Sequence, residues 1–176
     1  MNQPEVWLRG SVPDVPFFLQ PAAHALLQTQ EELEGYMRDF PEKWLWKSVA
    51  GRASVAFHLR HLTGVLDRLL TYAEGKELSL AQLEYLKNET IADSTGSEAL
   101  VKLFRIKVSE ALDIFKETPE EKLRESRTVG RKKLPSSVMG LYFHAAEHSQ
   151  RHLGQLLVTC SFVKNLAASS AGKSDT

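Results

Sequence analysis

The chain has 176 residues, 43% of them hydrophobic, which suits one globular domain with a single core. Its 22 basic and 22 acidic residues give a formal net charge of zero, which argues against nucleic acid as the main partner. A single cysteine excludes an intrachain disulfide. No apolar run is long enough to span a membrane and no signal-peptide pattern stands at the N-terminus, so we expect a cytoplasmic protein without a membrane partner.

Residues 1–20 contain three prolines and predict an extended lead-in. Several apolar side chains of this segment are expected to cover the core: Trp7, Val12, Phe17, Phe18 and Leu19. Pro21 suits the first turn of a helix, because its missing N–H group is not needed there. Apolar residues then recur with helical spacing to about Arg38, and Pro41 ends this first helix.

The second helix is expected to begin after Ser54, a favourable N-cap residue, and to end at Gly75. Its inward stripe combines two histidines with apolar residues: His58, His61, Leu62, Val65, Leu69 and Tyr72. Gly64 lies one turn after His61 on the same face. Because glycine has no side chain, this position permits another helix or a ligand to approach closely.

Two more helices are predicted after Gly75. Ser79 can cap a short helix that runs to about Asn88. Ser97 begins a third long helix, which carries a regular apolar stripe and is closed by Pro119.

Residues 124–135 are rich in arginine and lysine. We expect them to form a solvated loop or a small hairpin around Gly130. A second interpretation is that they form a rim that attracts an anionic substrate. The fourth long helix is predicted from about Ser137 to Asn165.

Four amphipathic helices without useful strand alternation predict an all-α protein, a four-helix bundle with a short extra helix between helices two and three. The bundle is expected to span residues 21–165, preceded by the lead-in of residues 1–20 and followed by a disordered tail of residues 166–176. Bundles build metal sites from side chains of facing helices, so the second and fourth long helices are expected to be neighbours.

Five of the six histidines fall in two short segments of these helices: His58 and His61, and His144, His148 and His152. A spacing of three or four residues places each group on one helix face. Two imidazoles at i and i+4 can hold one metal ion, whereas a ladder of three spans too far for all of them to do so easily. A lone histidine on an apolar face is usually a hydrogen-bonded core residue, but five in two groups favour a metal site.

Two segments resemble motifs of the DinB/YfiT-like family. Ser54-Val-Ala-Phe-His-Leu-Arg-His61-Leu62 is similar to the family's second-helix segment, where Ser or Thr precedes the ligand histidine by seven residues. Glu147-His148-Ser-Gln-Arg-His152-Leu-Gly-Gln155 is similar to its fourth-helix motif. The resemblance covers roughly residues 20–165 and implies the DinB/YfiT-like four-helix bundle.

The resemblance also implies a three-histidine site for a divalent metal, with His61, His148 and His152 as ligands. Zinc or nickel is the metal expected first, with iron or manganese as alternatives. His58 and His144 are additional to the minimal pattern. They are candidates for substitute ligands, for contacts to the ligands or for proton carriers, so the choice between His58 and His61 stays open.

Three neutral imidazoles leave a metal with an open coordination position, which can activate water or hold a thiolate. The resemblance therefore implies a metal-dependent enzyme of thiol S-transferase or hydrolase type. Its expected partners are a small-molecule substrate, such as a low-molecular-weight thiol, and a second copy of the chain in a homodimer. The sequence assigns no catalytic residue, and His58, His144 and Glu147 are the candidates.

Two alternative functions remain. The first is a non-catalytic dimeric bundle in which the metal only braces the fold, since a structural site is closed by four ligands and five histidines are present. The second is a zinc peptidase, because His144-Ala-Ala-Glu147-His148 fits the His-x-x-Glu-His pattern with Glu147 as general base. Such peptidases need a further acidic ligand, and the fourth helix offers none after Glu147.

Overall fold

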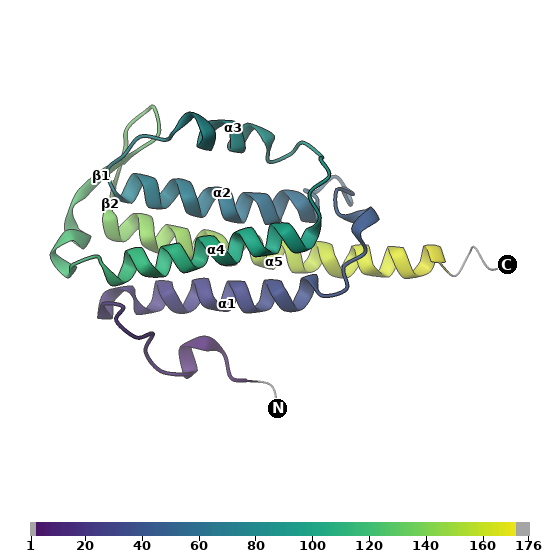
Figure 1. Cartoon of the computed structure of the whole chain (residues 1–176), viewed down its shortest axis with the longest axis horizontal. Coiled ribbons are helices and arrows are strands. Elements are labelled where there is room, and N and C mark those ends of the chain that lie inside the picture. Colours follow the sequence, from purple (N-terminus) through teal and green to yellow (C-terminus); the bar gives the residue numbers. More distant parts are fainter. Residues whose placement is uncertain (1–2, 172–176) are drawn as a thin grey trace.

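A computed structural model describes residues 3–171 of the chain. Four long helices lie side by side along the longest axis of the molecule: α1 (Gln20–Met37), α2 (Val55–Ala73), α4 (Ser97–Lys116) and α5 (Val138–Ala171) (Figure 1). The short helix α3 (Leu80–Asn88) lies against α2, in the long connection between α2 and α4. The predicted all-α four-helix bundle with a short extra helix is confirmed.

Helix α2 packs against α5, α4 and α3. It begins where expected, because the Ser54 side chain accepts a hydrogen bond from the backbone N–H of Phe57. It ends before Gly75, whose φ of +77° is the left-handed conformation that glycine adopts readily. Local capping signals therefore fix both ends of the helix that carries His58 and His61.

The N-terminal segment differs from the expected extended lead-in. It contains two 3-10 turns, at Val6–Leu8 and Phe17–Leu19. Leu19 is fully buried and Val12 is partly buried, as predicted, but Trp7, Phe17 and Phe18 are each more than half exposed. A 3-10 turn has three residues per turn, so only one of three consecutive side chains faces the bundle. The prediction that these three aromatic residues cover the core is wrong.

Residues 126–137 form a small antiparallel hairpin of β1 (Ser126–Val129) and β2 (Leu134–Ser137). The predicted hairpin around Gly130 is confirmed. It packs at the far end of α2 from the histidines, where Arg127 Nε donates to the carbonyl oxygen of Ala73 at 2.7 Å. His61 precedes Ala73 by 12 residues, roughly 18 Å along the helix. The basic hairpin therefore does not form a rim around the histidines.

Helix α5 is longer than predicted, since it continues past Asn165 to Ala171. The segment from Leu166 to Ala171 contains only leucine, alanine and serine, so no residue in it breaks a helix. The hydroxyls of Ser169 and Ser170 donate to carbonyl oxygens one turn earlier. The expected disordered tail is thus helical over residues 166–171, and residues 172–176 lie outside the described part. In the described residues, every helix is too short or too polar to cross a membrane.

Candidate metal site

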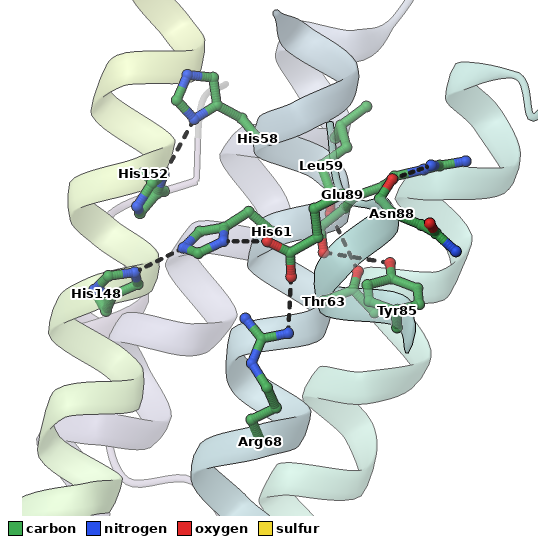
Figure 2. Close-up of polar contacts among 11 residues, drawn as sticks. His58, Leu59, His61, Thr63, Arg68, Tyr85, Asn88, Glu89, His148 and His152 are labelled. Carbon is green, nitrogen blue, oxygen red and sulfur yellow. Dashed lines mark hydrogen bonds and ion pairs between the residues drawn. The ribbon is translucent and has the colours of Figure 1, made fainter. Parts of the chain in front are cut away.

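The structure brings together the three histidines that the family motifs indicate. His61 on α2 faces His148 and His152 on α5, and one potential ligand atom from each lies within 4.8 Å of the other two (Figure 2). The Nε2 atoms of His61 and His148 are 3.0 Å apart. Two nitrogens on one tetrahedral zinc ion lie roughly 3.4 Å apart, so this spacing suits a shared ion. We call His61, His148 and His152 the inner trio.

The His61 ring is held by a carboxylate that the sequence did not single out. Its Nδ1 lies 2.7 Å from Glu89 Oε2, and Arg68 donates to Glu89 Oε1 at 2.8 Å (Figure 2). When Nδ1–H donates to this carboxylate, the Nε2 lone pair is left facing His148. A carboxylate behind a ligand histidine fixes the tautomer and ring orientation that a metal requires.

Glu89 is 3% exposed and forms the C-cap of α3. Burial would raise the pKa of its carboxyl group, but hydrogen bonds from His61 and Arg68, with the positive charge of Arg68, outweigh burial and lower it. Glu89 is therefore an anion at neutral pH. It links the Arg68 guanidinium, itself largely buried, to the His61 ring.

Gly64 allows this carboxylate to reach the His61 ring. A Cβ atom at position 64 would lie 2.6 Å from Glu89 Oε1 and 2.7 Å from a ring carbon of Tyr85. The close approach expected at Gly64 is thus made by α3. The turn after α3 is held in addition by Arg60, which donates to the carbonyl oxygens of Asn88 and Ile91 at 2.9 Å.

His58 lies beside the inner trio and not within it. Its Nδ1 is 3.1 Å from Nδ1 of His152, and the residue is 2% exposed. With Nδ1 of His152 in this hydrogen bond, Nε2 is the nitrogen of that ring left for a metal. His58 therefore orients His152 in the way that Glu89 orients His61. The His61 ring has a further neighbour, the Phe57 ring, which stacks on it with centroids 5.2 Å apart.

Burial keeps the imidazoles of His58, His148 and His152 neutral at physiological pH. Burial and the neighbouring His61 lower the pKa of His148 to about 4 and that of His152 to about 3. The pKa of His58 is lowered to about 4 for the same two reasons. Metals bind neutral imidazole, so His148 and His152 need no deprotonation before an ion binds at pH 7. Nδ1 of His148 is buried and has no hydrogen-bond partner among the described residues.

The other two catalytic candidates lie on the outer side of His148. The side chain of His144 is 47% exposed, and its Nδ1 is 3.3 Å from Glu147 Oε2. Oε1 of Glu147 accepts hydrogen bonds from Nε, at 3.0 Å, and from a second nitrogen of Arg151. The peptidase interpretation needs an acidic ligand besides the general base. Among residues 3–171 no such residue joins His144, Glu147 and His148.

An open cleft of about 740 Å³ borders the site on the side of His58. Its lining comes from the loop before α2, from His58 of α2 and from α5, and includes Arg52, Arg151 and Gln155. Both guanidinium groups belong to exposed residues. This cleft, and not the basic hairpin, places positive charge next to the histidines.

Comparisons with known proteins agree with this fold. A crystal structure of a protein from Streptococcus pneumoniae is similar, with a TM-score of 0.61 and 15% identity over 82% of this chain and 88% of that chain. An uncharacterized protein from Clostridium difficile 630 gives a TM-score of 0.60 and 13% identity over 82% and 94%. Comparison with curated proteins gave no match. The family model of the DinB superfamily matches residues 25–156, which include the whole inner trio, and the chain therefore belongs to the DinB superfamily.

Proposed function

We propose that the chain is a metal-dependent enzyme whose inner trio holds one divalent ion, zinc or nickel in the first place. The observation that carries the proposal is the convergence of three imidazoles, two of them with Nε2 atoms 3.0 Å apart, across α2 and α5. The donor set suits such an ion, since imidazole is a good ligand for zinc, nickel and iron. Glu89 and His58 support it by orienting two of the three rings.

The ligand number favours catalysis over a bracing role. Structural zinc sites are closed by four protein ligands. Within the described residues the inner trio is not joined by a fourth histidine, cysteine, aspartate or glutamate. A divalent ion held by three neutral imidazoles keeps an open position and its full positive charge, and so lowers the pKa of a water or thiol that it binds. The non-catalytic alternative requires a further ligand to close the site.

The proposed substrate is a small anionic molecule, with a low-molecular-weight thiol as the first candidate. The cleft beside His58 opens next to the inner trio, and Arg52 and Arg151 line it. A guanidinium group can bind a carboxylate with two parallel hydrogen bonds, so Arg52 can hold an acidic substrate at the edge of the site. Arg151 donates to Glu147 and adds positive charge to the cleft. The reaction class stays between thiol transfer and hydrolysis.

Metal analysis of the purified protein tests the first part of the proposal. We expect close to one divalent ion per chain in the wild type. The double variant His148→Ala/His152→Ala is expected to lose this metal while keeping its helical circular-dichroism spectrum. Full metal content in the double variant would show that the ligand assignment is wrong.

A reconstituted assay tests the reaction class. Zinc- and nickel-loaded protein would be incubated with a panel of acidic and neutral thiols and an electrophilic acceptor, in parallel with ester and amide substrates. Metal-dependent conjugation favours a transferase and metal-dependent cleavage a hydrolase. If neither occurs, and thiols leave the visible spectrum of the cobalt-substituted protein unchanged, the site is closed and the bracing role is the better explanation.

The proposal includes a homodimer. Large apolar side chains of α5, Phe143, Val158 and Phe162, are more than half exposed and offer surface for a second copy. Light scattering is expected to give about twice the chain mass of 19.8 kDa. A mass near 19.8 kDa at high protein concentration would reject the dimer.

A further inference from the structure

We infer that His144, Glu147 and His148 form an outer cation position from which a divalent ion reaches the inner trio by ligand exchange at the shared His148. We call these three residues the outer trio. The inference rests on the proposed function, because it presumes that the inner trio binds a metal. It adds an entry route and assigns a role to two residues that the inner trio does not use.

The outer trio has the composition and spacing of a cation site. One potential ligand atom from each of its residues lies within 4.8 Å of the other two. Two imidazoles and one carboxylate make a donor set that accepts the same first-row divalent ions as the inner trio. Helical geometry produces the cluster, since His144, Glu147 and His148 stand at i, i+3 and i+4 on one face of α5.

The outer trio is also the more accessible of the two clusters. The side chains of His144 and Glu147 are 47% and 35% exposed, against 17% for His61. Glu147 is oriented in advance, because Arg151 holds its Oε1 atom while Oε2 points to His144. A hydrated ion can therefore meet a carboxylate and an imidazole here before it loses most of its water.

His148 cannot serve both clusters at once. Its Nε2 atom lies 3.0 Å from Nε2 of His61 in the inner trio. Its other ring nitrogen, Nδ1, is buried and has no hydrogen-bond partner among the described residues. The proposed exchange uses the same Nε2 atom for both clusters, so the two positions exclude each other and the outer trio is a transfer position, not a second permanent site.

The clusters differ in a way that gives the transfer a direction. The carboxylate of Glu147 is shared with the Arg151 guanidinium, whose positive charge weakens binding of a cation at the outer trio. The inner trio offers three imidazoles, one of them backed by the buried Glu89 carboxylate. An ion therefore binds more tightly in the inner trio, and His148 is the ligand that both positions hold during the exchange.

The inference is tested by comparing the rate of metal uptake of variants with that of the wild type, while their equilibrium affinities for the metal are measured alongside. Metal-free protein would be mixed with Co²⁺ in a stopped-flow instrument, and uptake followed by the visible absorption of the ion. In His144→Ala and Glu147→Gln we expect uptake to slow by about tenfold, the low end of the range that local charge gives to association rates. The equilibrium affinity is expected to stay that of the wild type. His24→Ala, which removes a histidine of α1 outside both clusters, is the matched control and should take up Co²⁺ at the wild-type rate.

A second measurement isolates the outer trio. The variant His61→Ala/His152→Ala keeps all three outer residues and is expected to bind one Co²⁺ ion per chain, more weakly than the wild type. Adding His144→Ala should abolish this residual binding. Wild-type uptake rates in both His144→Ala and Glu147→Gln would overturn the inference. It would also be overturned if the His61→Ala/His152→Ala variant still bound Co²⁺ after His144→Ala was added. A wild-type protein that binds no Co²⁺ at equilibrium would instead overturn the proposed function itself.

Discussion

Replacing Glu89 by glutamine probes how the inner trio is held in place. The carboxylate accepts a hydrogen bond from each side, from His61 Nδ1 at 2.7 Å and from Arg68 at 2.8 Å. A glutamine amide has one oxygen, so it can accept from one of these groups but must turn its NH₂ group towards the other. Either His61 loses the acceptor that fixes its tautomer or the Arg68 guanidinium faces another donor.

The expected cost follows from these contacts. A hydrogen bond to a charged group contributes about 1.5–3 kcal/mol, and Glu89→Gln removes the carboxylate charge from both bonds. Loss of a partner behind a metal ligand usually weakens metal binding about 10- to 100-fold, which corresponds to about 1.4–2.8 kcal/mol. We expect the zinc affinity of Glu89→Gln to fall within this range, with one ion still bound per chain at saturation.

Competition for zinc with a chromophoric chelator measures this affinity, and circular dichroism checks that the variant is folded. The matched control is Glu84→Gln, which removes the same charge from an exposed position of the same helix α3 and should bind zinc as the wild type does. If folded Glu89→Gln binds zinc as tightly as the wild type, the carboxylate does not position His61 and the reasoning fails.

Three further outcomes are expected. Gly64→Ala should destabilise the protein by about 1–3 kcal/mol and weaken zinc binding, because its Cβ atom would lie 2.6 Å from a carboxylate oxygen. Gly154→Ala, where nothing lies within 4 Å of the added Cβ, should be neutral or stabilising in the same thermal unfolding experiment. Zinc at 100 times its dissociation constant should raise the free energy of unfolding of the wild type by about 2.7 kcal/mol, and a chelator should reverse this increase. An equal increase in His148→Ala/His152→Ala would contradict the ligand assignment. His58→Ala should lower zinc affinity by about tenfold without changing the stoichiometry, because the ring that orients His152 is lost; a stoichiometry of zero would make His58 a ligand.

Local signals explain what the sequence predicted well. Ser54 and Ser79 accept backbone hydrogen bonds at their helix starts, and Gly75 has the positive φ expected of a residue just after a helix end. Helical spacing likewise placed His58 and His61 on the face of α2 that looks towards α5. These features depend on residues a few positions apart, so the sequence contains all that is needed to predict them.

Glu89 could not be predicted from any local pattern. It follows the expected last residue of α3, and its contact with His61 depends on how that short helix returns across α2. Gly64 was the single sequence signal that another segment approaches this face of α2 closely, but it does not identify Glu89 as the approaching residue. The exposed aromatic residues of the N-terminal turns and the distance between the basic hairpin and the histidines also depend on tertiary packing, which propensity and spacing do not encode.

The hairpin has a consequence for how insertions would affect the site. Strand β2 ends at Ser137 and α5 begins at the next residue, while Arg127 of β1 is bonded to the end of α2. The rotation of α5 about its own axis is thereby set relative to α2. One extra residue between Ser137 and His148 would turn the downstream helix by about 100° and carry its histidines away from His61. Extra residues in the turn at Gly130 would leave that angle unchanged. Insertions in the turn are therefore compatible with the histidine site, whereas insertions between Ser137 and His148 are not.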